Sequence, residues 1–114
     1  MKTRGLFFVV ILLFVFSLAN AHPAKKVEIS WNKEKSELTI IAEHPVKDVK
    51  THFIDEIVIE VNGEEVAKIE VKEQTGKEQE KLVKSLENIK SGDVIKVTTS
   101  CNKFGKKSAE ITIE

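Results

Sequence analysis

The feature that most limits the fold is a period-two alternation of apolar and polar residues, which recurs in short segments along the chain. In residues 26–31, for example, Val27, Ile29 and Trp31 alternate with polar residues. This period matches a β-strand, whose side chains point to opposite faces in turn, and it does not match the 3.6-residue period of a helix. The chain is therefore expected to be all-β.

Seven short strands are expected. Asn62-Gly63 predicts a tight hairpin between the third strand and its return, because both residues tolerate the positive φ of a type I′ turn. Turn residues separate the other strands at intervals typical of a two-sheet fold, so we predict an immunoglobulin-like antiparallel β-sandwich. Six strands are expected at residues 26–31, 36–43, 53–61, 79–86, 93–100 and 107–113, and the seventh is the return strand that carries Val66, Ile69 and Val71.

Residues 78–90 are open to a second interpretation. Leu82, Leu86 and Ile89 are spaced as on one face of a short helix. The residues that follow position 85 are typical of the corner between two strands of an immunoglobulin-like sandwich. We therefore prefer a strand at 79–86 followed by that corner.

The first 21 residues differ in composition from the rest. Lys2 and Arg4 precede an unbroken apolar run from Leu6 to Phe16, and small residues follow at 17–21. This order is typical of a secretory signal peptide, and the run is shorter than the roughly 20 residues that span a bilayer. We expect export to the periplasm or the extracellular space, with residues 1–21 removed and residues 22–114 forming one domain. Cleavage two residues earlier, after Ala19, also fits the pattern.

Composition excludes several classes of function. The chain carries 18 basic and 18 acidic residues, so no basic excess suggests a nucleic-acid partner. No membrane attachment is expected after cleavage of the signal peptide. The single cysteine excludes an internal disulfide framework. The residues left to carry chemistry are three histidines and one cysteine.

Strand direction predicts that these four residues gather at one end of the sandwich. Successive strands run in opposite directions, so the connections between them alternate between the two ends. His22 precedes the first strand, His44 closes the second, His52 opens the third and Cys101 follows the sixth. Imidazole and thiolate groups bind iron, copper and zinc. We therefore predict a metal site formed by His44, His52 and Cys101.

His22 is a further candidate ligand. If it is the N-terminal residue after cleavage, its α-amine and its imidazole could chelate one metal ion together. This role also requires the N-terminal segment to be ordered.

Each of these residues also has an ordinary structural explanation. A lone histidine in a β protein is commonly a surface residue or a satisfied polar group, and a lone cysteine can be a small buried hydrophobe. Two observations favour ligands. His52 has the opposite strand parity to Phe53 and Ile57, which argues against an ordinary core position, and Cys101 lies at a turn.

Four sequence motifs resemble the iron domain of the desulfoferrodoxins and neelaredoxins, the superoxide reductases. The resemblance covers roughly residues 36–113. It implies an immunoglobulin-like sandwich that holds mononuclear non-haem iron through four histidines and one cysteine thiolate, and that reduces superoxide to peroxide. By position, His44 and His52 match two of the histidines and Cys101 matches the thiolate. The motifs are His44-Pro45, His52-Phe53-Ile54, Gly92-Asp93 and Cys101-Asn102-Lys103-Phe104-Gly105.

The sequence departs from this family at three points. Phe104 stands where the family has a histidine ligand, and the gap between His44 and His52 is two residues longer than the family pattern. No Glu-Lys-His segment precedes the first strand, which leaves His22 as the only candidate for the missing N-terminal ligand. The ligand set is therefore incomplete, and a superoxide reductase-like oxidoreductase activity is left open.

The sequence thus predicts an exported iron-binding domain, with superoxide or another small anion as its small-molecule partner. The lysines at 103, 106 and 107 would steer such an anion, or they form an ordinary solvated turn. The sequence identifies no electron donor. Two alternatives are a non-catalytic copper- or zinc-binding or delivery protein, and an immunoglobulin-like interaction module without metal.

Overall fold

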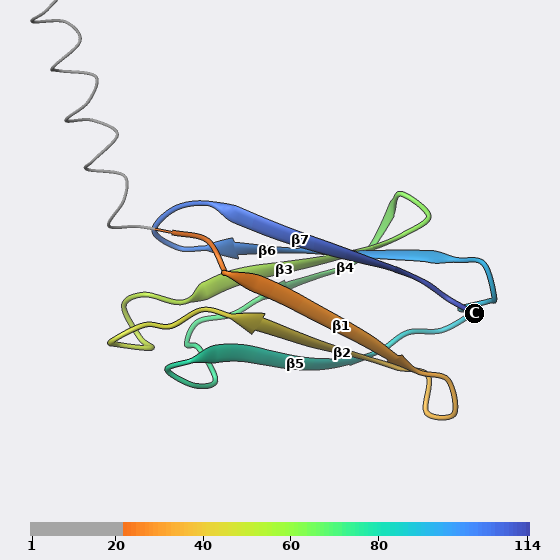
Figure 1. The fold of residues 1–114 in the computed structure, drawn as a ribbon, viewed down its shortest axis with the longest axis horizontal. Helices are drawn as coiled ribbons and strands as arrows, with labels where there is room; N and C mark the ends of the chain where they lie inside the picture. The colour runs from red at the N-terminus through yellow and green to blue at the C-terminus, as the bar shows by residue number, and fades with distance from the viewer. Residues whose placement is uncertain (1–21) are drawn as a thin grey trace, which may run out of the picture.

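The computed structural model describes residues 22–114, which form seven antiparallel strands in two packed sheets (Figure 1). The sheet orders are β1-β2-β5 and β4-β3-β6-β7. The prediction of an all-β antiparallel sandwich is confirmed. The strands are β1 (Lys26–Asn32), β2 (Glu37–Glu43), β3 (Ile54–Val61), β4 (Glu64–Glu70), β5 (Gln79–Ser85), β6 (Val94–Cys101) and β7 (Lys106–Thr112).

The ambiguous segment is a strand, as preferred, because β5 covers residues 79–85 and pairs with β2. The fourth strand, β4, pairs with β3, whereas constant-type immunoglobulin domains place the fourth strand in the other sheet. The described residues contain no helix of the length and apolarity needed to cross a membrane. The expected signal peptide, residues 1–21, lies outside the described residues.

The core lies between the two sheets and follows the alternation seen in the sequence. In β2, Leu38, Ile40 and Ala42 are fully buried, while the residues between them are partly exposed. Ile57 and Ile59 of β3 and two residues of β6 face them from the other sheet. Each buried aliphatic side chain of this size contributes about 1.5–3 kcal/mol, so this layer holds the sheets together.

The tight hairpin is where the sequence predicts it. Asn62 and Gly63 join β3 to β4 with φ values of 52° and 83°, and Val61 pairs directly with Glu64. The strand parity assigned to His52 is wrong, however. The strand begins at Ile54, after His52, and its register to β6 shifts between Ile54 and Glu56. This irregularity buries Ile54 together with Ile57, so the alternation of β3 does not extend back to His52.

The N-terminal segment packs onto the sandwich before β1 begins. Ala24 is buried, and the backbone N–H of Lys25 donates to the carbonyl of Glu43 at 2.8 Å. Pro23 lies against Gly105 in the β6–β7 turn, where a Cβ atom on the glycine would be 2.8 Å from Pro23 Cδ. These contacts hold the chain in place up to His22.

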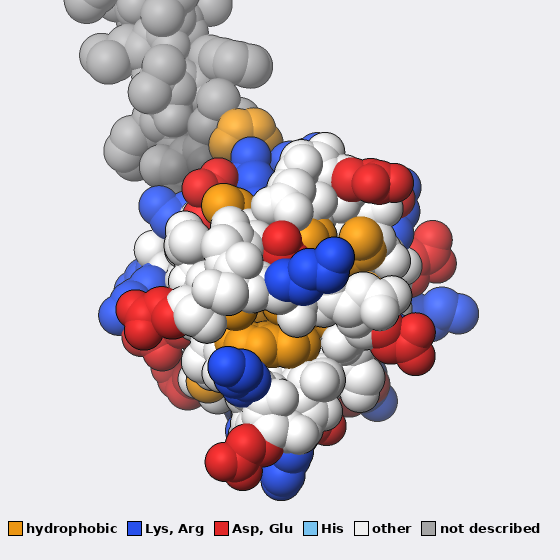
Figure 2. All heavy atoms as spheres, turned by 90° about the vertical axis from the view of Figure 1, so that its right-hand side faces the viewer, with side chains coloured by type: hydrophobic (Ala, Val, Ile, Leu, Met, Phe, Trp, Pro, Cys, Tyr) orange, Lys and Arg blue, Asp and Glu red, His pale blue; other side chains and the backbone are white. Residues whose placement is uncertain are grey.

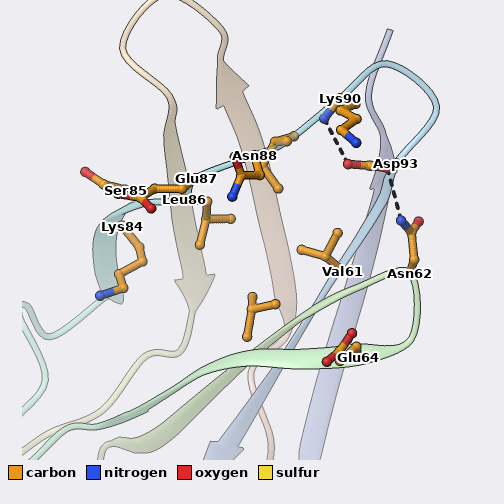
Figure 3. Close-up of a pocket in the computed structure, with 12 residues that line it drawn as sticks. Val61, Asn62, Glu64, Lys84, Ser85, Leu86, Glu87, Asn88, Lys90 and Asp93 are labelled. Atoms are coloured by element: carbon orange, nitrogen blue, oxygen red, sulfur yellow. Dashed lines mark hydrogen bonds between the residues drawn. The ribbon is translucent and has the colours of Figure 1, made fainter.

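The opposite end of the sandwich carries no histidine on the face that Figure 2 shows, where acidic and basic side chains surround a small apolar patch. A hollow of ≈ 590 Å³ lies there, bordered by the side chains in Figure 3. Asn62 Nδ2 donates to Asp93 Oδ1 at 3.0 Å and the backbone N–H of Lys90 donates to Asp93 Oδ2 at 2.9 Å. These two bonds, that from Asn62 first, lower the pKa of Asp93. The bond from Asn62 ties the hairpin turn to the residue that precedes β6.

The Pro23–Gly105 contact predicts different costs for two glycine substitutions. Gly105 and Gly92 both have φ of 91°, but a Cβ on Gly92 would meet nothing within 4 Å. Gly92→Ala should therefore cost only the backbone strain of about 1–2 kcal/mol. Gly105→Ala should cost about 1 kcal/mol or more beyond that, since Pro23 must move. Denaturant unfolding of both variants measures the difference, and equal losses would contradict the packing of Pro23.

Candidate metal centre

Four residues that are far apart in sequence meet at one end of the sandwich. This end lies on the left in Figure 1, where β2 and β6 finish and β1 and β3 begin. His44 directly follows β2, His52 precedes β3 by two positions, and Cys101 is the last residue of β6. One imidazole nitrogen of each histidine and the Cys101 sulfur all lie within 4.8 Å of one another. The predicted convergence of His44, His52 and Cys101 is therefore confirmed, and this group could hold a metal ion.

His22 lies beside this group. Its ring centroid is 5.4 Å from that of His44 and 5.6 Å from that of His52, and the His44 and His52 centroids are 4.8 Å apart. Its carbonyl oxygen lies 3.3 Å from His44 Nε2, and its own Nδ1 donates to the carbonyl of Pro23 at 3.0 Å. The three histidines thus form a cluster, with His22 outside the tight three-residue group.

The cluster leaves a buried nitrogen without a partner. His52 Nε2 is buried and accepts or donates no hydrogen bond within residues 22–114. An unpartnered buried polar group costs about 1–3 kcal/mol, and a metal ion would remove that cost by taking the nitrogen lone pair. Among the buried side-chain nitrogen and oxygen atoms of the described chain, only this one lacks a partner.

The surroundings of His52 favour its neutral form. Burial is the main cause that lowers the pKa of His52, and the nearby His44, His22 and Lys103 lower it further. A neutral imidazole is the form that binds metals. Lys103 thus acts on the site through its charge, although its side chain is exposed.

Gln74, in the loop between β4 and β5, is the partner of His44. It is 2% exposed, and its Oε1 lies 2.8 Å from His44 Nδ1. Its Nε2 donates to the carbonyls of His44, at 2.7 Å, and Gly76, at 2.8 Å. Sequence reasoning missed this residue, because a lone glutamine in a polar loop carries no local mark of a contact 30 positions away.

Asn102 holds the other half of the site together. Its Oδ1 accepts from the backbone N–H of Phe53 at 2.9 Å, and its Nδ2 donates to the carbonyl of Thr51 at 3.0 Å. Its backbone N–H donates to the carbonyl of Phe53 at 3.0 Å. Three hydrogen bonds therefore fasten the turn after Cys101 to the residues on both sides of His52. The sequence placed Asn102 beside Cys101 but gave no indication of this role.

The sulfur of Cys101 lies in a partly polar setting. The residue is 8% exposed, and its Sγ accepts a hydrogen bond from the backbone N–H of Lys103 at 3.4 Å. An N–H donor aimed at sulfur stabilises negative charge on it, as a thiolate ligand requires. Phe104, two residues further along, is 49% exposed and lies on the surface.

A hollow of ≈ 450 Å³ opens beside the cluster. Both His22 and His52 line it, whereas His44 and Cys101 do not. The partly exposed histidines therefore face solvent, and the buried histidine and cysteine lie behind them. The other lining residues are Pro45, Val46, Lys47, Asp48 and Thr51.

The donor set fits a metal ion of the zinc, copper or iron type. Donor atoms bound at about 2.0–2.3 Å to one ion lie roughly 3–4 Å apart, so side-chain shifts of about 1 Å would bring this group to binding distance. Two imidazoles and a thiolate suit those metals, whereas magnesium and calcium prefer oxygen ligands.

The bonds of Asn102 predict a variant that loosens the site. Asn102→Ala removes two side-chain hydrogen bonds between the Cys101 turn and residues 51–53, so the free energy of unfolding should fall by about 1–3 kcal/mol. The Cys101 thiol should also react faster with a thiol reagent, because its turn is released.

Asn32→Ala is the matched control. Asn32 Oδ1 accepts from the backbone N–H of Lys35 at 3.0 Å, in the β1–β2 turn at the opposite end of the sandwich. This control should lower stability without changing the reaction rate of Cys101. Equal thiol rates in the two variants would show that Asn102 does not hold the Cys101 turn.

Comparison with known proteins does not identify a family for this chain. No model of a known protein family matches the chain, and its sequence matches no curated protein. The features of the described residues that bear on function are therefore the His44, His52 and Cys101 group, the adjacent His22 and the hollow beside them.

Proposed function

We propose that this protein is an exported mononuclear iron-binding domain of the superoxide reductase type. His44, His52 and Cys101 hold the metal, and His22 supplies the fourth donor from the N-terminal side. The observation that carries the proposal is the convergence of two imidazoles and the only thiol of the chain within 4.8 Å, with a buried imidazole nitrogen left unpartnered. Export rests on the signal-peptide pattern of residues 1–21.

The choice of iron rests on the resemblance to the desulfoferrodoxins and neelaredoxins. His44, His52 and Cys101 occupy the positions of ligands in that family's motifs, and these are the residues that lie together here. When bound, ferrous iron supplies the single electron that reduces superoxide, with two protons, to hydrogen peroxide. The electron would be replaced by an external one-electron donor.

The residues around the cluster suit a small anion. The hollow beside His22 and His52 is bordered by Lys47, and the charge of Lys103 also reaches His52. A positive charge at the mouth of a site raises the local concentration of an anionic substrate. Asp48 also borders the hollow and opposes this effect, so the net attraction is modest.

Phe104, which stands where the superoxide reductases have a histidine ligand, affects metal binding and catalysis differently. This residue replaces a family ligand, and its half-exposed side chain lies on the surface. The metal would therefore be held by at most three imidazoles and one thiolate, instead of four and one. Binding requires only that these donors converge, whereas the redox chemistry also depends on their number.

The proposed site should bind one iron ion. Protein loaded anaerobically with ferrous iron should bind one equivalent and, after oxidation, show an absorption band from charge transfer between the thiolate and iron. Cys101→Ser should lose the band, and His52→Ala should bind iron at least tenfold more weakly. At a free iron concentration of 100 times its dissociation constant, the protein should gain about 2.7 kcal/mol of stability.

Lys107→Ala is the control for these variants, because Lys107 is an exposed residue of β7. It should bind iron as the unaltered protein does. One equivalent of copper or zinc bound in preference to iron would favour the non-catalytic delivery protein. If the protein binds none of the three metals, the metal site is contradicted. The immunoglobulin-like interaction module without metal is then the remaining hypothesis.

The proposed activity should depend on the bound iron. With an external one-electron reductant present, the protein loaded with ferrous iron should consume superoxide, supplied by an enzymatic source, faster than the metal-free protein does. His52→Ala should slow this consumption, since the residue both holds the metal and borders the hollow. Equal rates for the unaltered protein and His52→Ala, with iron bound in both, would exclude superoxide reduction at this site.

A further inference from the structure

We infer that Gln74 is a positioning residue that fixes His44 in the one tautomer able to bind a metal through Nε2. The inference deepens the proposed function, on which its metal-binding part rests. It rests on the orientation of one buried amide group, each atom of which has defined partners.

The orientation of the Gln74 amide follows from two backbone carbonyls. A carbonyl oxygen only accepts, so the atom that contacts the carbonyls of His44 and Gly76, at 2.7 and 2.8 Å, is the amide nitrogen. The amide oxygen then faces the backbone N–H of Ile54, from which it accepts at 3.2 Å. In the reverse orientation the amide oxygen would face two carbonyl oxygens and the amide nitrogen would face the N–H of Ile54, so none of these three contacts would be a hydrogen bond.

The orientation of the amide determines the proton position on His44. Gln74 Oε1 also lies 2.8 Å from His44 Nδ1, and an amide oxygen can only accept, so Nδ1 carries the hydrogen. A neutral imidazole carries a single N–H, which leaves the lone pair on Nε2. That lone pair faces the carbonyl oxygen of His22 at 3.3 Å, which offers no hydrogen. In the neutral ring a cation would serve as the partner of both the lone pair and the carbonyl oxygen, whereas only a doubly protonated ring would donate to that oxygen.

The loop that carries Gln74 is itself held in place. The backbone N–H of Gln74 donates to the carbonyl of Val49 at 3.1 Å, in the segment between His44 and His52. The next residue, Thr75, donates its backbone N–H to the carboxyl group of the buried Glu80 at 3.0 Å. The glutamine thus links the His44 side of the site to the start of β3, and Thr75 fastens the same loop to β5. Hydrogen bonds of this kind to a ligating histidine orient the ring and raise its affinity for metal.

The test begins with the unaltered, metal-free protein. At about pH 8, above the ordinary histidine pKa, nitrogen-15 NMR of the imidazole rings should show His44 protonated at Nδ1 and bare at Nε2. The reverse tautomer would overturn the inference. This measurement needs no metal, so it remains decisive even if the protein binds no iron and the proposed function fails.

Two variants then separate positioning from simple support of the loop. Gln74→Met keeps the length of the side chain but removes every side-chain hydrogen bond, so the Nδ1–H form of His44 should lose its dominance. Binding of ferrous iron, added alone, should weaken by 10- to 100-fold. Gln74→Glu keeps the acceptor for His44 Nδ1 and should retain the tautomer, with an affinity above that of Gln74→Met.

Gln79→Met is the matched control, because the side chain of Gln79 is exposed at the start of β5. It should change neither the tautomer nor the affinity for iron. If Gln74→Met folds but keeps both the Nδ1–H tautomer and the affinity, the glutamine only supports the loop and the inference is wrong. If Gln74→Met does not fold, the tautomers of the unaltered protein and of Gln74→Glu decide the question.

Discussion

The candidate site depends on two antiparallel strand pairings, one in each sheet. In the first sheet, Lys26 pairs with Glu43, which brings the chain before β1 beside the chain after β2. In the second sheet, Ile54 pairs with Cys101, which brings the chain before β3 beside the end of β6. Each sheet therefore delivers two of the four candidate ligands, and packing of the sheets joins the two pairs. A shift of either register by two residues would separate the two members of that sheet's pair along the strand axis by about 7 Å, which is more than the site tolerates.

Much of this arrangement can be read from the sequence, because it depends on short-range patterns. The alternation in segments such as 36–43 reports directly which face is buried, and Asn62-Gly63 requires the positive φ that a two-residue hairpin provides. Alternation of strand direction then decides which loops share an end. The convergence of His44, His52 and Cys101 needs no knowledge of side-chain positions, only the count of strands between them.

The parts that the sequence does not reveal are those fixed by contacts between distant segments. The irregularity near Asp55 breaks the parity of β3, and nothing in the local residue types marks it. Gln74 and Asn102 are polar residues of loops, where their types are common for ordinary reasons. Their importance comes from backbone groups about 20 to 50 positions away, which only the folded chain brings within reach. The same holds for Pro23, whose packing against Gly105 orders the segment that carries His22.

The four candidate ligands differ in how firmly they are held, and this difference bears on what the site can do. His44 is fully buried and hydrogen-bonded to Gln74, and Cys101 lies behind a turn that Asn102 fastens. Their donor atoms are therefore preorganised, as strong ligation requires. His22 and His52 line the hollow, and His52 Nε2 has no competing hydrogen bond within the described chain. A metal ion at this position would be anchored on the Cys101 and His44 side and approached by small molecules from the side of His22 and His52.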